Sequence, residues 1–204
     1  MLDNANARRS AARFIDPVAR LMLRLKVTPD GITWFGCGAT IFISVVFLAQ
    51  GNFLIGAILF GAFGLIDLLD GTMARMLGTA GPWGAFLDST LDRISDAAVI
   101  CALIYFYVNA DSSNSQLAVI AGIVSLVMSL MTSYASAKAE SLDAKCTVGI
   151  AERAERNLLI WVALLISALV TDVMPYALAA LAVLSTITVI QRILFVRKQL
   201  VIKA

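Results

Sequence analysis

The chain has 204 residues, of which 60% are hydrophobic and 15% are charged, and its formal net charge is +2. Soluble domains usually contain about 45–50% apolar and about 25% charged residues. One modest core cannot bury so many apolar side chains, so lipid is predicted to surround most of the chain, and the predicted fold is an all-α integral membrane protein. The chain has no histidine, which excludes Ser-His-Asp and Cys-His catalysis and zinc sites with histidine ligands. No nucleic-acid partner is predicted.

Residues 1–30 are predicted to form a cytoplasmic segment with a short amphipathic helix on the membrane surface. Asp16 followed by Pro17 is a typical helix start, with an N-cap residue and then proline in the first turn. Apolar residues then recur at helical spacing: Val18, Leu21, Met22 and Leu25. Basic residues flank this stripe, as in helices that lie on membranes: Arg20, Arg24 and Lys26. A loose basic tail that only sets the topology is the alternative.

Residues 31–204 are predicted to form one domain of six transmembrane helices. A bilayer core of about 30 Å needs roughly 20 helical residues. The apolar runs that meet this need, with the fifth one short, are residues 32–50, 53–75, 84–108, 116–138, 156–171 and 174–195. The segments between them are rich in turn-forming residues and are too short to form a second domain.

The basic residues lie on one side of the predicted membrane. With six spans, the breaks at residues 50–52, 109–115 and 171–174 share the other side, and none contains Lys or Arg. Cytoplasmic loops carry the excess of Lys and Arg in membrane proteins. Both termini are therefore predicted to be cytoplasmic, and the protein is predicted to lie in the cell membrane.

Eight chemically distinctive residues follow a regular spacing at the second and third predicted spans. They form the pattern D-x-x-D-G-x-x-A-R-x8-G-x-x-x-D-x-x-x-D, with Asp67, Asp70, Gly71, Ala74, Arg75, Gly84, Asp88 and Asp92. Residues at i, i+3, i+4 and i+7 share a helical face, so each half of the pattern lies on one face of its helix. The break at residues 78–82 turns the chain, so the two faces are predicted to meet near the cytoplasmic end.

Four aspartates in such apolar surroundings indicate a metal site. Each intramembrane charge costs at least about 2.5–3.5 kcal/mol on insertion scales. Converging carboxylates raise one another's pKa unless a cation holds them. Oxygen-only ligands favour Mg²⁺ or Mn²⁺, and one or two such ions could neutralise a pyrophosphate. Asp96, one turn beyond Asp92, is expected either to support the metal ligands from behind or to serve packing, paired with Arg93.

The small residues of the pattern are consistent with such a site. Gly71 and Ala74 leave a notch where a base or a phosphate could approach the helix, although close helix packing is an alternative reason for small residues in membranes. Arg75 can donate to a phosphate or fix a carboxylate.

This complete set of eight residues resembles the signature of the CDP-alcohol phosphotransferase family, and the six-span layout is similar as well. The resemblance implies transfer of a phosphatidyl group from CDP-diacylglycerol to an alcohol, with release of CMP. It implies that Asp67, Asp70 and Asp88 bind metal and that Asp92 is both a metal ligand and the general base. The CDP-diacylglycerol site that it implies consists of Asp30, Thr33, Gly71, Ala74, Arg75 and Gly81. A homodimer and two Mg²⁺ or Mn²⁺ ions per site are also implied.

Basic residues on the cytoplasmic side indicate a phosphorylated acceptor, although topology and lipid-headgroup contact could also account for them. The patterns S-Y-x-x-A-K-A-E and I-x-E-R-x-E-R are similar to those of actinobacterial phosphatidylinositol-phosphate synthases, which use inositol 1-phosphate. That resemblance implies an acceptor-phosphate pocket of Ser133, Lys138, Arg153, Arg156 and Arg192. Some of those enzymes have a further basic residue where this chain has Ser136, which leaves the strength of phosphate binding open.

Three alternatives remain at this point. The first is a phosphatidylglycerol-phosphate synthase, whose acceptor, glycerol 3-phosphate, is also phosphorylated. The second is a CDP-alcohol phosphotransferase that acts on another alcohol, which would leave the basic residues without a clear task. The third is a divalent-cation transporter, in which intramembrane aspartates bind the ion in transit, but this explains neither the small residues nor the basic cluster.

Overall fold

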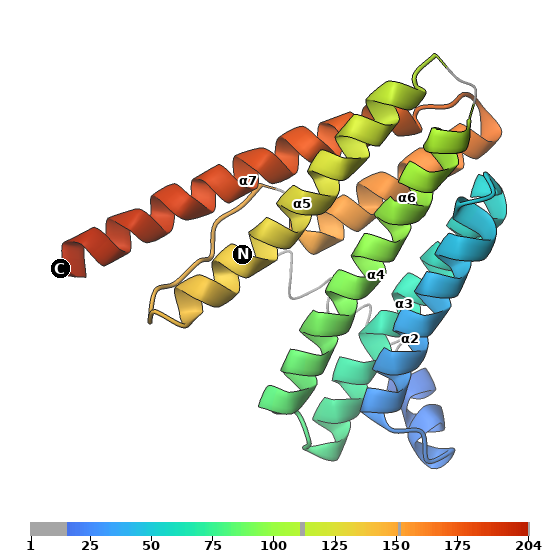
Figure 1. Ribbon diagram of the computed structural model, residues 1–204. Helices are drawn as coiled ribbons and strands as arrows, with labels where there is room; N and C mark the ends of the chain where they lie inside the picture. Colours follow the sequence, from blue (N-terminus) through green and yellow to red (C-terminus); the bar gives the residue numbers. More distant parts are fainter. Residues whose placement is uncertain (1–15, 111–112, 151, 204) are drawn as a thin grey trace. The chain divides into compact units, whose positions relative to one another are not determined.

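The computed structural model describes residues 16–110, 113–150 and 152–203, and the side chains of residues 65–68 and 202–203 lie outside this description. The described residues form helices joined by short turns and loops, which confirms the all-α prediction (Figure 1). The helices after the first are α2 (Pro29–Ile43), continued by a π-helical turn (Ser44–Leu48), α3 (Phe53–Leu77), α4 (Pro82–Asn109), α5 (Ser115–Glu140), α6 (Arg153–Leu169) and α7 (Met174–Lys203). Each expected span falls on one of these six helices.

Local sequence explains where several of these helices begin and end. Thr28 caps α2, because its side-chain oxygen accepts a hydrogen bond of 3.1 Å from the amide of Gly31, and Pro29 follows in the first helical position. Gly78 has a φ of +66° directly after the last residue of α3. That left-handed conformation suits glycine and ends a helix. Pro82 then begins α4, so the turn expected at residues 78–82 is confirmed.

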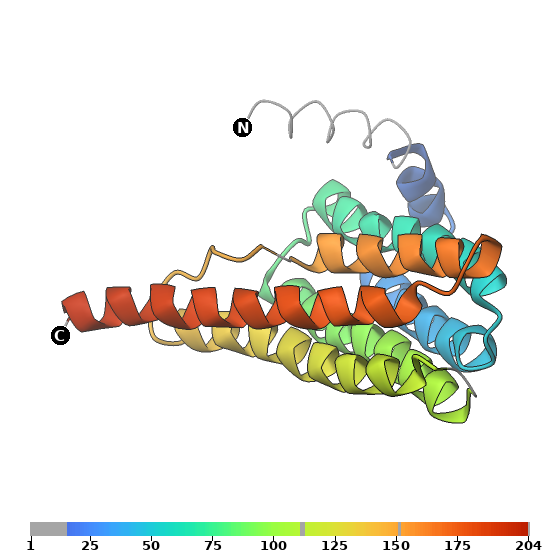
Figure 2. The same ribbon diagram turned by 90° about the horizontal axis from the view of Figure 1, so that it is seen from above.

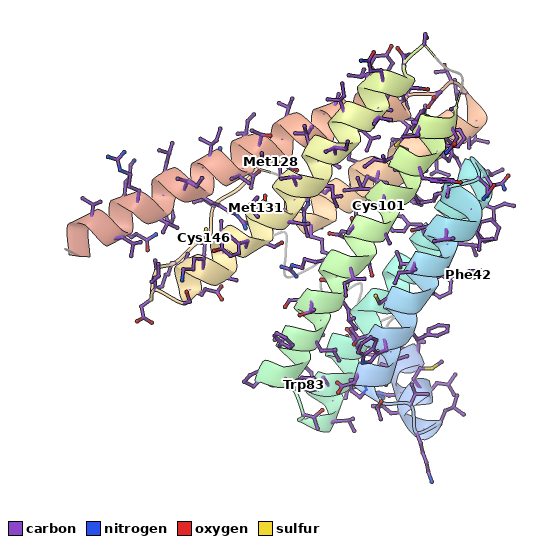
Figure 3. The ribbon with its side chains drawn as sticks, viewed as in Figure 1. Phe42, Trp83, Cys101, Met128, Met131 and Cys146 are labelled. Carbon is purple, nitrogen blue, oxygen red and sulfur yellow. The ribbon has the colours of Figure 1, made fainter. Side chains whose placement is uncertain are left out.

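Within the described residues, four helical stretches are long and apolar enough to cross a membrane by length and composition. They are Pro29–Leu48, Phe53–Leu77, Ser115–Glu140 and Met174–Val201. Helix α6 has only 17 residues, and the first half of α4 carries Asp88, Asp92, Arg93 and Asp96, so both fall short of this criterion. Large apolar side chains are exposed on the helices, such as Phe42 on α2 at 60% (Figure 3), as expected where lipid is the solvent.

The chain divides into two compact units, and helices α3 and α4 contribute residues to both. The first unit contains Ile58–Ser95 together with the chain up to Ile43. Its core has two clusters. In one, Ala19, Ile32, Leu69 and Met73 are buried together, and in the other Cys37 of α2 packs against two α4 leucines, Leu87 and Leu91. Helix α2 therefore packs on both α3 and α4 within this unit.

The predicted amphipathic helix is present, because residues 16–24 are helical as far as the description reaches. Ala19 is fully buried, and Met22 and Leu23 pack beside it against the first unit. Val18, Leu21 and Leu25 are exposed, at 41%, 52% and 63%. One side of the segment therefore holds it to the protein, while another side presents the apolar surface expected at a membrane.

The second unit contains Ser44–Ala57 and Asp96–Ala204. In it α5 lies along α7, and α6 also packs on α7 (Figures 1 and 2). Small residues line the buried side of α5, and a Cβ atom at Gly122 would lie only 2.6 Å from Ile104 Cγ1. The hydroxyl of Ser125 donates to the backbone oxygen of Leu178 on α7 at 3.0 Å. Small residues and interhelical hydrogen bonds of this kind hold membrane helices together.

Candidate active site

Asp70 lies near the end of α3, between the buried Leu69 and Met73 that anchor this part of the helix in the core. The residue is only 9% exposed, and its carboxylate accepts hydrogen bonds from α2 and from its own helix. The buried hydroxyl of Thr33 on α2 donates to Oδ2 at 2.7 Å, and the amide of Gly71 donates to Oδ1. Each carboxylate oxygen has two lone pairs. The Thr33 hydroxyl and the Gly71 amide, both neutral donors, therefore orient the carboxylate without neutralising its charge.

Asp88 and Asp92 lie one turn apart on α4, in the same unit as Asp70. Asp92 is 9% exposed and Asp88 is half-buried. The neighbouring Leu87 and Leu91 pack against Cys37 of α2, and the thiol of Cys37 donates to the backbone oxygen of Leu91 at 3.6 Å. Because these contacts hold the leucine face of α4 on α2, the rotation of α4 and the direction of its aspartates are fixed.

The side chain of Asp67 lies outside the described part of the structure. Among the side chains that are described, no group of three acidic, cysteine or histidine residues is placed to hold a metal ion. The remaining donors, Asp70, Asp88 and Asp92, are all carboxylates, and two of them are buried. An oxygen-only donor set of this kind suits a hard divalent cation such as Mg²⁺ or Mn²⁺. The residues therefore fit the expected metal, with Asp67 needed to complete the set.

The residues expected to bind CDP-diacylglycerol lie in the first unit. Asp30 is not free, because its Oδ2 accepts a hydrogen bond of 2.9 Å from the indole of Trp83. Trp83 lies in the first turn of α4 (Figure 3). A Cβ atom at Gly71 would meet only the guanidinium of Arg75, at 3.4 Å, among the described atoms outside the local helix backbone, and the notch beside Gly71 stays a prediction. Arg75 is exposed and donates to Thr72 at 3.0 Å. Ala74 is half-buried and Gly81 is exposed.

The residues expected to bind the acceptor phosphate lie in the second unit. Arg153 and Arg156 occupy the first turn of α6, and both approach the carboxylate of Asp96 on α4. Arg153 Nε is 3.5 Å from Oδ1, and Arg156 Nη2 is 3.6 Å from Oδ2. Arg156 is only 6% exposed, and its Nη1 also donates to the backbone oxygen of Ser129 on α5 at 3.5 Å. The two arginines are thus brought together around one carboxylate.

Arg192 joins α7 to α5 and to the loop before α6. Its Nη1 donates to the backbone oxygen of Thr132 at 2.5 Å and to the hydroxyl of Ser136 at 2.6 Å. Its Nε donates to the backbone oxygen of Val148 at 3.0 Å. Ser133 is half-buried and Lys138 is exposed on α5. Three donors of Arg192 are therefore already engaged within the second unit.

The contacts of Asp96 differ from those expected from the sequence. Arg93 does not pair with Asp96 but donates to the backbone oxygen of Ser89, one turn earlier in α4, because its side chain points back along the helix. Asp96 pairs with the two α6 arginines instead. Trp83 is a further residue that the sequence did not single out, and no spacing signal connects it with Asp30.

Comparisons with known proteins identify the family of the chain. Residues 26–190 match the CDP-alcohol phosphatidyltransferase family. The phosphatidylinositol phosphate synthase of Cutibacterium acnes is 39% identical over 196 residues, which cover 92% of this chain and 94% of the relative.

Solved structures from Mycobacterium tuberculosis are also similar. Its phosphatidylinositol phosphate synthase with CDP-DAG bound has a TM-score of 0.84 and 35% identity, covering 91% of this chain and 94% of that one. The same enzyme in complex with manganese and citrate has a TM-score of 0.83 and 35% identity, covering 88% and 87%. The chain belongs to the CDP-alcohol phosphatidyltransferase family.

Proposed function

We propose that this protein transfers the phosphatidyl group of CDP-diacylglycerol to a hydroxyl of inositol 1-phosphate, producing phosphatidylinositol phosphate and CMP. The acceptor class rests above all on the basic pair in the first turn of α6, where Arg156 is almost completely buried. Charged arginines are rarely buried without a functional or structural partner, and a phosphate dianion matches the guanidinium fork. The relatives named phosphatidylinositol phosphate synthase support the same acceptor.

The residue roles that we propose rest on the resemblance to the family signature. Asp67, Asp70 and Asp88 would hold one or two Mg²⁺ or Mn²⁺ ions, with Asp92 contributing to the second. When bound, such ions neutralise charge on the pyrophosphate as the P–O bond breaks. Thr33 orients Asp70 through its hydrogen bond. The CDP group would lie in the notch beside Gly71, Ala74 and Arg75, with Asp30 and Gly81 nearby. A manganese-bound relative supports the cofactor.

Asp92 is proposed to take the proton of the acceptor hydroxyl. As that proton moves to the carboxylate, the hydroxyl oxygen forms a bond to the phosphatidyl phosphorus and the bond to the bridging oxygen breaks. CMP leaves with the bridging oxygen, so no covalent enzyme intermediate is needed. Ser133, Lys138, Arg153, Arg156 and Arg192 would meanwhile bind the phosphate of the acceptor, which fixes the position of its hydroxyl.

The membrane arrangement is also part of the proposal. We propose six spans, with the segment of residues 1–30 and both termini on the cytoplasmic side of the cell membrane, and a domain of residues 31–204. Homodimerisation is proposed from the family resemblance alone, and the mass of the detergent-solubilised protein measured by light scattering tests it. A monomer at all concentrations would contradict it.

CMP release by the purified protein tests the reaction. The protein is supplied with Mn²⁺ or Mg²⁺, CDP-diacylglycerol and, separately, inositol 1-phosphate, glycerol 3-phosphate, inositol or serine. We expect CMP release with inositol 1-phosphate to exceed that with each other acceptor. Activity with glycerol 3-phosphate alone would overturn the acceptor, and the absence of CMP with every acceptor would overturn the enzymatic function itself.

The variant Asp92→Asn tests the proton acceptor. An amide cannot accept the proton, and general-base catalysis contributes about 10²–10⁴-fold, so we expect turnover to fall at least a hundredfold. Mn²⁺ binding, measured by titration calorimetry, should be largely retained. The exposed Glu140 at the end of α5 provides a matched control, since Glu140→Gln removes one carboxylate and leaves the four signature aspartates unchanged. Near-normal turnover of Asp92→Asn would show that another group is the base.

A further inference from the structure

Asp96 is a partly buried residue of α4 that lies outside the family signature. Each of its two oxygens faces a different arginine: Oδ1 is 3.5 Å from Arg153 Nε, and Oδ2 is 3.6 Å from Arg156 Nη2. The side chain of Asp96 is 19% exposed, compared with 33% for Arg153 and 7% for Arg156. A single carboxylate therefore connects the two arginines that occupy the first turn of α6.

The placement of these arginines is electrostatically unfavourable without an anion. The N-terminus of a helix carries a partial positive charge, so cations in its first turn are destabilising and anions are stabilising. The buried guanidinium of Arg156 also loses hydration, which makes an unpaired charge costly there. Asp96 supplies one resident negative charge against two positive charges. A phosphate bound at this end of the helix would add a further stabilising negative charge.

The contacts also determine how the guanidinium groups are oriented. Arg156 is held at two points, by Asp96 through Nη2 and by the backbone oxygen of Ser129 through Nη1. Arg153 approaches Asp96 through Nε, the nitrogen closest to its aliphatic stem, at 3.5 Å, so the carboxylate attracts this end of the guanidinium. Because a guanidinium recognises phosphate through a planar fork, its orientation decides how well it binds.

We infer that Asp96 is a positioning residue that holds Arg153 and Arg156 in the orientation that binds the phosphate of the acceptor alcohol, and so sets the affinity for that substrate. This inference rests on the proposed function of the arginines. Asp96 does not touch the reacting atoms in this role. It acts through the two arginines, and its loss should affect acceptor binding much more than the chemical step.

Steady-state kinetics of Asp96→Asn test this inference. The amide keeps the size of the side chain but removes the charge, and one lost charge-assisted contact corresponds to about tenfold in affinity. We expect the KM for inositol 1-phosphate to rise about tenfold or more, with the KM for CDP-diacylglycerol unchanged and kcat within about twofold. A lower acceptor KM would show that Asp96 only competes with the phosphate, and an unchanged KM would show a packing role. Either result would overturn the inference.

Two further variants separate positioning from general charge or folding effects. Glu155 is an exposed acidic residue in the same helical turn, so Glu155→Gln removes an equal charge and should leave the acceptor KM within about twofold. Asp96→Glu restores the carboxylate on a longer side chain, so its acceptor KM should lie between those of the wild type and Asp96→Asn. If Asp96→Asn does not fold, the kinetics of Asp96→Glu alone test the positioning role. Its longer side chain shifts the arginines, so the acceptor KM should rise severalfold without a change in the CDP-diacylglycerol KM, and an unchanged acceptor KM contradicts positioning.

Inorganic phosphate distinguishes failure of this inference from failure of the proposed function. Phosphate should compete with the acceptor for the arginines, so its inhibition constant should rise in Asp96→Asn by the same factor as the acceptor KM. This comparison holds for whichever phosphorylated acceptor the wild-type protein uses. If the wild type prefers glycerol 3-phosphate, the proposed function fails but the inference stands when both constants rise. If both constants stay the same, the inference fails whatever the acceptor.

Discussion

Thr33 shows how a single hydroxyl can connect two parts of the site. It was expected to contact the nucleotide, and the structure places its hydroxyl on Asp70, 37 residues away in the sequence, at 2.7 Å. The same oxygen lies 3.2 Å from the backbone oxygen of Pro29. Thr33 is only 8% exposed. Its direct contact in this structure is therefore with a proposed metal ligand, and it is placed to orient that ligand.

We predict that Thr33→Val weakens metal binding. Valine has nearly the same shape but cannot donate to Asp70, and loss of a hydrogen bond to a ligating group typically costs about 10–100-fold in metal affinity or activity. Titration calorimetry with Mn²⁺ would measure the change, and Thr33→Ser, which keeps the hydroxyl, is the matched control. Equal Mn²⁺ affinity in the valine and serine variants would show that Thr33 does not orient Asp70.

Gly71 provides a test of the nucleotide site at the same scale. An added Cβ atom would meet only the flexible end of Arg75, at 3.4 Å, so Gly71→Ala should fold with little change in thermal stability. The methyl group would nevertheless fill the notch where CDP is proposed to lie. We expect the KM for CDP-diacylglycerol to rise about tenfold, with the acceptor KM unchanged. A variant that folds and binds CDP-diacylglycerol normally would show that Gly71 serves only helix packing.

At the scale of elements, Arg192 connects three parts of the second unit by hydrogen bonds: α7, α5 and the loop before α6. Its side chain joins α7 to Thr132 and Ser136 of α5 and to Val148 in the loop before α6. Gly149 follows in that loop with a φ of +153°, and a Cβ atom there would lie 2.7 Å from Thr188 Cγ2 on α7. The loop therefore lies directly against α7. Arg192 thus has a structural task in addition to the proposed phosphate binding.

We predict that Arg192→Lys destabilises the protein even though it preserves the charge. A lysine ammonium cannot reproduce the planar fork, so at least one of the three hydrogen bonds should be lost. A hydrogen bond to a charged group contributes about 1.5–3 kcal/mol. Thermal unfolding in detergent would measure the loss, with Arg197→Lys, an exposed position on the same helix, as the control. Equal melting temperatures for both variants would argue against this role.

For the whole molecule, the proposed orientation in the membrane leads to a labelling experiment. Cys146 lies half-buried in the loop between α5 and α6, which is proposed to be cytoplasmic. Cys37 and Cys101 lie in helices. Both are replaced by alanine in the experiment, so that a maleimide can react with Cys146 alone. A membrane-impermeant maleimide should label Cys146 in inside-out vesicles but not in intact cells. Ser113→Cys, between α4 and α5, should show the opposite pattern when Cys146 is also replaced. Labelling of both positions from the same side would contradict the six-span topology.

Much of the architecture could be predicted from local sequence. The helices follow the apolar runs, and the turn after α3 follows from Gly78 and Pro82, because backbone preferences and apolar length act over a few residues. Which side chains pair with one another was harder to predict from the sequence. The expected Arg93–Asp96 pair was wrong because both arginines of α6 reach Asp96 instead. Nothing in the spacing of residues 153 and 156 indicates which acidic residue they will meet.

The sequence by itself determined the helical membrane class, the aspartates of the signature and the family, because composition and spacing along a helix are local properties. Only the tertiary structure decided the partners of those residues. It placed Thr33 on Asp70, Trp83 on Asp30, Asp96 between two arginines and Arg192 on Thr132, Ser136 and Val148. Such contacts join distant parts of the chain and depend on how each helix is rotated and packed. That packing results from many apolar contacts together, and no single motif specifies it.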